Sequence, residues 1–573
     1  MRRTVINICM LGALAALPLS AMIVAAGPMG ASAVVDAAMN GNRDAVRALL
    51  KDGADVNTAQ ADGMTALHWA AQKGDVELAK VLLYASANVR ATTRIGGYTP
   101  LLIASRNGDA AMIQALVDGG ADPNNATTNG TTALMFAAAA GKNDAVKLLI
   151  EKGANVNAKE NVKGETALTF AAAYGRLDVV RELTAHKADV SVTTKVQDLA
   201  AFAKEEQERL AELFQQQGRA GQGRGGRGGE GRGPQIPGVN RQYNYTELVA
   251  YWGGLAPLHL AARQGYTEVA NALLDAGADV NQRTTGDQST PLVIAIVNGR
   301  FDLAKQLVDR GADPNLAQVN NGVTPLYAAL NCQWSDKALY PQPRAFEQQK
   351  NSYLDLMKAL LDKGADPNAR LTRKVWYSQY DFDQSGVDET GATPFFRAAY
   401  AADVDGMKLL LQYGADPYIT TMRTPGRVRT GDVTREVQDV SPLPPVPPGG
   451  PAISPLLAAS GEGYGEGFAA NHHHHSPAGM LPAVKFLVEE VGIDVNVKDH
   501  DGNTAVHNAA ARGDNEMIQY LVSKGADVKQ VNREGKTTAD MANGPVQRIS
   551  PFPDTIKLLE GMGAKNNHKC VSC

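Results

Sequence analysis

Apolar and small residues recur along the chain in paired helical patterns that are separated by glycine. In ALHWAAQKG, which follows Thr65, the alanines fall on one side of a predicted short helix, and Gly74 ends it because glycine tolerates left-handed backbone geometry. The next segment, VELAKVLL, places its apolar residues at the spacing of one helical face. The glycine of the GAD or GAN motif that follows is typical of the residue just beyond a helix. The pattern predicts a two-helix unit that must stack on neighbours, because a pair of this size cannot bury its own apolar face.

The unit repeats with a period of 33 or 34 residues. The residue before the first helix marks eleven copies: Thr65, Thr99, Thr132, Thr166, Ala256, Thr290, Thr324, Thr393, Ser454, Thr504 and Thr537. A second marker, GADVN or a close variant, follows in fixed phase, and the segment from Ala33 to Asn57 is a twelfth copy that lacks its start. Two markers in phase predict a stacked repeat array, an architecture that grows in one dimension and so accommodates a chain of 573 residues.

The units resemble ankyrin repeats, because they match the motif TPLH-x-A and its 33-residue period. The resemblance implies an all-α solenoid of about 12 helix–turn–helix units with hairpin fingers, and protein–protein recognition as the general function. It also implies that His68, His259 and His507, which stand at the His position of the motif, order the turn locally and have no catalytic role.

Departures from the period divide the chain further. We expect repeats one to five over residues 33–194 and repeats six to twelve over 253–562, with an insertion at 195–252 and a tail at 563–573. Further insertions lie near 331–351, 371–389, 421–450 and 461–480. Insertions in repeat arrays map to loops and often lie at the rim of the binding face.

The insertion at 195–252 has two parts. The first predicts one amphipathic helix, whose apolar face carries Leu199, Phe202, Ala203, Leu210, Leu213 and Phe214. The second, GRAGQGRGGRGGEGRGP, is too poor in apolar residues to fold. Its arginines resemble those of RGG segments that bind single-stranded nucleic acid, but it lacks aromatic residues, and we therefore favour a flexible tether.

The N-terminus has the features of an export signal. Arg2 and Arg3 precede an apolar run that ends in small residues at Ala26, which predicts a signal peptide over residues 1–26 and a periplasmic or secreted protein. The alternative is an uncleaved anchor, because the apolar stretch from Val5 to Ala26 is about long enough to span a membrane. The formal net charge of −4 gives no reason to expect a nucleic-acid partner.

Two short motifs suggest metal or redox chemistry. The run His472–His475 offers nitrogen ligands, but adjacent residues rarely form a closed tetrahedral set, and a solvated loop is favoured. The tail carries Cys570 and Cys573 in a C-x-x-C spacing, without the following His that covalent haem attachment needs. A disulfide or free thiols are therefore favoured over a metal or haem site, and we expect no cofactor. Because no catalytic constellation stands out either, we expect no enzymatic activity.

The candidate binding site is the position after the His of the motif, which the resemblance places on the concave groove. It is large and apolar in six repeats: Trp69, Ile103, Phe136, Phe170, Leu260 and Ile294. An exposed apolar strip of this length usually marks a binding site. Polar contacts are expected from Arg94, Tyr98 and Arg106 at its rim. Trp376 and Tyr377, in the insertion at 371–389, are expected to contact a partner, because Trp and Tyr dominate interface hot spots, or else to pack back over the groove as a cap.

Two alternatives remain open for this strip. Its side chains fill the space between neighbouring helices, or the helix at the start of the 195–252 insertion covers them. The sequence thus predicts a non-enzymatic scaffold that binds a protein or peptide partner, with a scaffold that carries a C-terminal redox, metal or haem element as the alternative function. The Pro-rich strip SPLPPVPP, from Ser441, is expected to be a stiff spacer in preference to a ligand for a Pro-reading domain.

Overall fold

The computed structural model describes residues 32–216, 241, 245–334, 344–375, 387–425, 439–463, 474–544 and 550–568. These residues form two compact units. The first runs to Ala104 and includes Ala111–Ala121; the second comprises Ser105–Ala110 and the chain from Asp122 onward. The expected signal peptide, the Gly/Arg-rich tether and the two tail cysteines lie outside the described residues.

Both units consist of helix pairs, which confirms the predicted all-α repeat fold. The first helix of each pair, here the inner helix, is α1 (Ala33–Met39), α3 (Ala66–Lys73), α5 (Pro100–Asn107), α7 (Ala133–Ala140), α9 (Ala167–Ala173), α13 (Pro257–Gln264), α15 (Pro291–Val297), α17 (Pro325–Gln333), α19 (Pro394–Tyr400), α21 (Pro455–Ala459), α23 (Ala505–Ala511) or α25 (Thr538–Ala542). The second, here the outer helix, is α2 (Arg43–Lys51), α4 (Val76–Tyr84), α6 (Ala110–Asp118), α8 (Asn143–Glu151), α10 (Leu177–Ala185), α14 (Thr267–Asp275), α16 (Phe301–Asp309), α18 (Tyr353–Asp362), α20 (Val404–Gln412), α22 (Met480–Lys485), α24 (Asn515–Ser523) or α26 (Pro553–Gly561).

Local residue chemistry sets the ends of the inner helices. The hydroxyls of Thr290 and Thr324 accept hydrogen bonds from the backbone N–H groups three residues on, each at 3.3 Å. These bonds satisfy a donor that the first helical turn leaves unpaired. At the other end of α7, Gly141 adopts φ +74°, a conformation that glycine reaches without steric cost.

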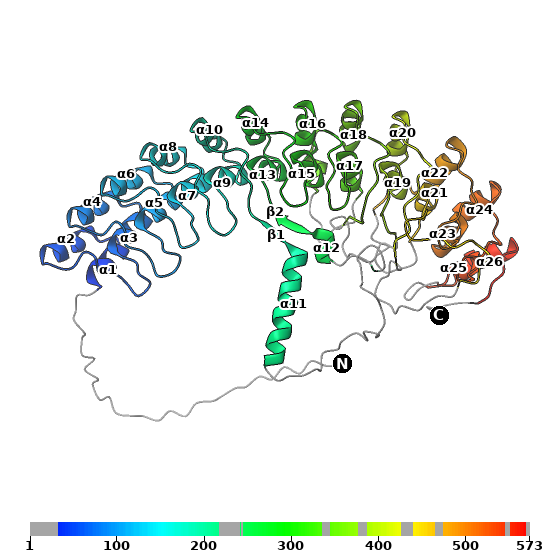
Figure 1. The fold of residues 1–573 in the computed structure, drawn as a ribbon, viewed down its shortest axis with the longest axis horizontal. Helices are drawn as coiled ribbons and strands as arrows, with labels where there is room; N and C mark the ends of the chain where they lie inside the picture. The colour runs from blue at the N-terminus through cyan, green and yellow to red at the C-terminus, as the bar shows by residue number, and fades with distance from the viewer. Residues whose placement is uncertain are drawn as a thin grey trace, which may run out of the picture. The chain divides into compact units, whose positions relative to one another are not determined.

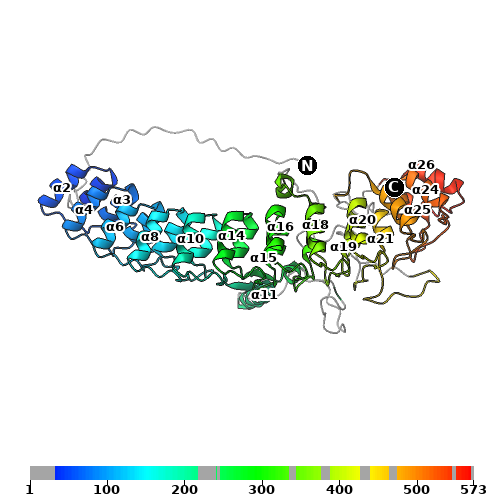
Figure 2. The same cartoon turned by 90° about the horizontal axis from the view of Figure 1, so that it is seen from above.

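Within the second unit, the inner helices stack in one row and the outer helices in another (Figures 1 and 2). Their buried alanines, such as Ala137 and Ala171, allow the inner helices to approach closely. α9 packs directly against α13, and α10 against α14, although the 195–252 insertion separates each pair in sequence. The insertion therefore leaves the stack continuous.

The asparagine of the GADVN motif links each repeat to the next. In the second unit, Asn124, Asn157, Asn281, Asn315, Asn368 and Asn496 accept a backbone N–H of the following repeat at 2.7–2.9 Å. Their side-chain amides donate to a backbone carbonyl of that same repeat. We call this set of six the asparagine ladder. It explains why the motif ends in Asn, since the amide supplies an acceptor and a donor at once.

The ladder is interrupted where other residues stand at the Asn position. Ser191 has no amide, and Gln282 of the next repeat donates to its carbonyl at 2.7 Å instead. Tyr418 reaches the carbonyl of Val491 with its hydroxyl at 3.2 Å, and Lys529 occupies the position in repeat eleven. The two longest insertions, 195–252 and 421–450, follow Ser191 and Tyr418 directly.

The 195–252 insertion folds at its base. β1 (Val196–Asp198) pairs antiparallel with β2 (Tyr251–Gly253), and α11 (Leu199–Gln216) leaves β1 directly. α12 (Tyr245–Val249) precedes β2 and buries Leu248 and Val249. Gly253, at φ +89°, is required here because a Cβ atom would lie 1.9 Å from the carbonyl oxygen of Lys195.

One outer helix differs because its sequence has one extra residue. FLVEEVGIDVN carries Val491 where LLIEKGANVN passes straight to glycine. α22 accordingly ends in a π-helical turn over Phe486–Glu490, which absorbs the additional residue inside the helix. The Asn496 side chain thereby keeps its place in the asparagine ladder.

The insertion near 331–351 returns to the repeat before it. Its 3₁₀ turn (Ala345–Gln348) stacks Phe346 on Phe301 with ring centroids 5.7 Å apart. The carboxylate of Asp302, in the first turn of α16, accepts the backbone N–H groups of Lys350 and Asn351 at 2.9–3.1 Å. This part of the insertion is therefore an integral part of the array.

Candidate functional site

The six large apolar residues expected in the groove each occupy the fourth position of an inner helix, and we call the set of residues at this position the inner-helix stripe. In the first unit it includes Trp69 and Ile103. Trp69 is half-buried, and its Nε1 donates to Oε1 of Gln60 at 3.0 Å. Ile103 is 3% exposed and belongs to the core. Only the indole is therefore partly open to a partner in this unit.

In the second unit the stripe changes character along the stack. Phe136 on α7 and Phe170 on α9 are half-buried. Leu260 and Ile294 are 4% and 8% exposed, so these two side chains pack inside the array. The positions that follow are buried and are small or polar: Ala328, Arg397, Ala458 and Asn508. The expected continuous exposed strip is thus reduced to Phe136 and Phe170, and their role in binding stays a prediction.

Arg397 replaces an apolar residue on the stripe and is almost fully buried. Its Nε donates to Oδ1 of Asn331 at 2.8 Å, and its Nη2 donates to the carbonyl of Trp334 at 2.7 Å. The guanidinium also lies over the ring of Tyr400, 5.9 Å from its centroid. These contacts give Arg397 a structural role in joining repeats eight and nine.

The expected rim residues belong to a finger and a turn. Arg94 is exposed, and its backbone N–H donates to the carbonyl of Asp62 on the preceding finger at 2.8 Å. Tyr98 is half-buried and Arg106 is exposed. Trp376 and Tyr377 lie outside the described residues, so their expected contact with a partner stays a prediction.

The three motif histidines confirm the expected local role. The backbone N–H groups of Thr65, Ala256 and Thr504 donate to Nδ1 of His68, His259 and His507 at 3.0–3.1 Å. Since Nδ1 accepts, the proton lies on Nε2, which in His259 donates to the carbonyl of Gln282 at 2.9 Å. Burial lowers the pKa of His259 and His507 to about 4. The rings are thus neutral structural groups.

The helix α11 does not cover the stripe. It packs against α12 and β1 of its own insertion, and Phe202 and Leu210 on its apolar face are 51% and 42% exposed. Figure 1 shows α11 leading away from α9 and α13. The alternative in which these residues bury the inner-helix stripe therefore does not describe this structure.

The Pro-rich strip is held along its backbone. Arg533 donates from Nη1 to the carbonyl of Leu443 at 3.2 Å and from Nη2 to that of Pro444 at 2.6 Å. Arg423 donates to the carbonyl of Val446. Proline-reading domains bind extended segments of this kind in grooves, so two arginines that already hold the backbone favour the spacer interpretation. Sequence reasoning missed both anchors, because they lie outside the strip.

A buried aspartate joins three helices and was also missed. The carboxylate of Asp403, at the N-terminus of α20, accepts from Nε1 of Trp334 and from the hydroxyl of Tyr353, each at 2.9 Å. It also accepts the backbone N–H of Gly406 at 2.9 Å, which caps α20. Burial raises the pKa of its carboxyl. An Asp before the helix indicates a cap, but its two other partners come from distant segments.

Family comparison agrees with this geometry. Models of ankyrin repeats match residues 34–127, 101–194 and 258–371 in three copies, and related ankyrin models match 390–422 and 471–522. Together these matches cover more than half of the chain. The chain is an ankyrin-repeat protein.

Curated relatives of this ankyrin-repeat protein share short stretches with it. Protein phosphatase 1 regulatory subunit 12A of Rattus norvegicus is 35% identical over 95 residues, which is 17% of this chain and 8% of that protein. Protein phosphatase 1 regulatory subunit 27 of Mus musculus is 33% identical over 90 residues, 16% of this chain and 53% of that protein. Putative glutaminase 2 of Caenorhabditis elegans is 40% identical over 70 residues, 12% and 11% of the two chains. The chain therefore spans less than two thirds of the length of these relatives.

The described part of this ankyrin-repeat protein contains no group of three His, Cys, Asp or Glu side chains placed to hold a metal ion. The ring of His474 lies tilted against that of Trp334, with centroids 5.4 Å apart, and its Nδ1 lies 3.3 Å from Nη1 of Arg344. His472 and His473 lie outside the described residues, as do Cys570 and Cys573, so the redox or metal alternative stays a prediction. No helix in the described ranges is both long and apolar enough to cross a membrane.

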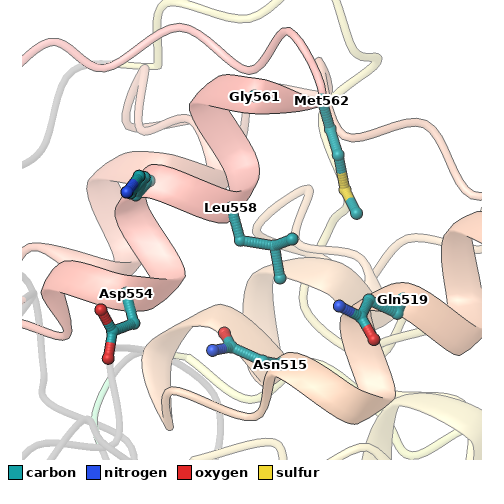
Figure 3. Close-up of a pocket in the computed structure, with 7 residues that line it drawn as sticks. Asn515, Gln519, Asp554, Leu558, Gly561 and Met562 are labelled. Atoms are coloured by element: carbon teal, nitrogen blue, oxygen red, sulfur yellow. The ribbon is translucent and has the colours of Figure 1, made fainter.

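A shallow hollow of about 500 Å³ lies between the outer helices α24 and α26 of the ankyrin array (Figure 3). Leu558 lies between the two helices and faces Asn515 and Gln519. The Asn515 amide oxygen already accepts the hydroxyl of Thr555 at 2.7 Å. Asp554 and Lys557 are the charged residues that line the hollow. The lining contains no arrangement of a nucleophile with a general base, so we assign no catalytic role to it.

Proposed function

We propose that this ankyrin-repeat protein is a non-catalytic scaffold that binds a protein or peptide partner through the inner-helix stripe of its second unit. The observation that carries the proposal is the pair Phe136 and Phe170. Both aromatic side chains are half-buried, and they occupy the same position of two inner helices, α7 and α9, that pack against each other. Aromatic residues, phenylalanine among them, are enriched at the cores of protein interfaces, where a few well-packed side chains carry most of the binding energy.

The neighbouring residues limit the site. Leu260 and Ile294 occupy the same helical position in the next two repeats but are buried, so they belong to the core and not to the contact surface. Beyond them the stripe turns to Ala328 and the buried Arg397, which offer no apolar surface. The proposed contact is thus centred on repeats four and five. The regulatory subunits among the relatives are consistent with a binding role, and the proposal takes no partner from them.

We expect Phe136→Asp and Phe170→Asp, singly and together, to abolish partner recovery while the repeats stay folded. Each carboxylate would have to be desolvated against the partner, and loss of one interface anchor costs about 2 kcal/mol or more, about thirtyfold in affinity. The measurement is cross-linking in native cells, identification of the recovered proteins, and titration of the purified partner against each variant.

Tyr174→Asp is the matched control. Tyr174 lies at the C-terminal end of the same helix, is 54% exposed, and the change adds the same charge away from the stripe. It should leave binding unchanged, and thermal melting reports folding for all variants. Recovery of the same proteins by wild type and by a folded double variant would remove the stripe as the binding site.

We also propose that the scaffold acts in the periplasm or outside the cell, on the strength of the export pattern in residues 1–26. The protein isolated from its native cells should then have the intact mass of a chain that begins at Gly27. The mass of the whole chain would contradict cleavage and would favour the uncleaved anchor.

A further inference from the structure

The insertion exposes an apolar surface that the repeats leave uncovered. Phe202 and Leu210 on α11 are half-exposed, and Trp252 on the adjacent strand β2 is 57% exposed. Tyr251 and Val196 at the base of the helix are also exposed. Large apolar side chains exposed to solvent on adjoining elements are typical of an interaction site.

The base of α11 is fixed. Leu199 is buried, and its backbone N–H donates to the carbonyl of Ala250 at 2.9 Å. Arg241 makes a two-point ion pair with Glu247 of α12, with distances of 2.7 and 2.9 Å. The helix therefore leaves the paired strands β1 and β2 in a defined direction, and its exposed apolar residues lie beyond them.

Charge narrows the class of partner. The described side chains of α11 include Glu205, Glu206, Glu208 and Glu212 against Lys204 and Arg209. Anionic lipid surfaces attract basic helices, so this acidic helix does not suit them. A second apolar helix whose charges complement this one is the partner that fits.

The charged residues at the centre of α11 complement those of a second, antiparallel α11. Glu206 is half-buried on the apolar face, four residues from both Phe202 and Leu210, and its Oε1 lies 2.6 Å from Nη2 of Arg209. Since α11 runs from Leu199 to Gln216, Glu206 and Arg209 are equally far from its midpoint. If two antiparallel copies of the helix are related by a two-fold axis through this midpoint, Glu206 of each copy lies opposite Arg209 of the other. The arrangement therefore contains two such charge pairs. A shift that sets Glu206 against Glu206 is repulsive, so the charges specify the register.

We propose that α11 pairs antiparallel with α11 of a second copy of this chain, with Phe202 and Leu210 in the contact and Glu206 opposite Arg209. The surface is separate from the inner-helix stripe on Phe136 and Phe170. The paired α11 helices would thus hold two scaffolds together, while the inner-helix stripe of each copy stays available to a partner.

The test is the mass of the full chain in solution, by sedimentation or light scattering, from low to about 100 µM protein. We expect a dimer whose population rises with concentration, and a monomer for Phe202→Asp with Leu210→Asp. Ala201→Asp with Lys204→Gln is the matched control, because it also lowers the net charge by two and lies on the opposite face of the helix. It should remain dimeric.

The register is tested by charge reversal. Glu206→Arg should weaken dimerisation at least tenfold, because it sets two arginines against each other, and adding Arg209→Glu should restore it. A monomeric wild type at the highest concentration would overturn the proposal. So would a dimer that is insensitive to the Phe202 and Leu210 changes, or double charge reversal without recovery. Helix content by circular dichroism identifies variants that have merely lost α11.

Discussion

Acidification from pH 7 to pH 4 is expected to lower the free energy of unfolding by about 6 kcal/mol through His259 and His507. Burial lowers the pKa of both rings from 6.5 to about 4, which corresponds to about 3 kcal/mol for each. Between these pH values the unfolded chain binds protons that the folded chain excludes. The stabilisation is therefore nearly complete at pH 7, is lost progressively as the pH falls from 6.5 to 4, and is gone below the folded-state pKa of about 4. Burial also lowers the pKa of His68, which adds in the same direction.

The hydrogen bonds of the three histidine rings also predict that acidification destabilises the fold. In each ring Nδ1 accepts a backbone N–H, so protonation would remove an acceptor that the start of the inner helix uses. The measurement is denaturant unfolding at several pH values, with amide exchange resolved by repeat. Repeats two, six and eleven should lose protection before repeat five, where Thr169 accepts the equivalent N–H at 2.6 Å and does not titrate.

The matched variant replaces all three histidines by glutamine. Glutamine at this position can accept the same N–H and donate from its amide, as in a capping box, without titrating. The triple variant should lack the histidine contribution, so its free energy of unfolding should fall about 6 kcal/mol less than that of the wild type between pH 7 and pH 4. An equal loss of stability in wild type and variant would show that other groups cause the acid sensitivity.

Asp403→Ala is expected to cost about 4 kcal/mol of stability. The change removes the N-cap of α20, which contributes about 1 kcal/mol. It also leaves Nε1 of Trp334 and the hydroxyl of Tyr353 without their buried acceptor, at about 1–3 kcal/mol each. Chemical denaturation followed by tryptophan fluorescence measures the loss.

Two controls separate the cap from the bridge. Asp514→Ala removes a comparable N-cap, which accepts Met517 N–H at 3.0 Å and pairs with the part-buried Arg512, and should cost about 1 kcal/mol. Asp403→Asn keeps one oxygen as an acceptor and should fall between the two. Equal effects of Asp403→Ala and Asp514→Ala would show that the bridge to Trp334 and Tyr353 adds nothing.

The sequence predicts most of the repeat fold, because each boundary has a local cause. The predicted helices after Thr65 and Asp75 are observed as α3 and α4, whose ends lie at a threonine cap, at Gly74 and at an aspartate cap. These signals act within four residues. Repetition then carries the assignment from one unit to the next.

Long-range packing explains what the sequence does not show. Whether Leu260 or Phe170 is the more exposed depends on what lies over each position, and both read as large apolar residues at the same place. The bridge of Asp403 to Trp334 joins residues 69 positions apart through an insertion. The extra Val491 was visible in the sequence, since one repeat is a residue longer than its neighbours.

The interruptions of the asparagine ladder determine where this array tolerates a long loop. A loop inserted behind an intact rung must keep two hydrogen bonds in place while the chain lengthens. Behind Ser191 and Tyr418 that demand is relaxed, because neither residue carries the bridging amide. These are the positions at which a longer loop costs little stability, and the two longest insertions lie there. The α11 helix thus leaves the array just after a position without a bridging amide, so a change in the length of this insertion breaks no bond of the asparagine ladder.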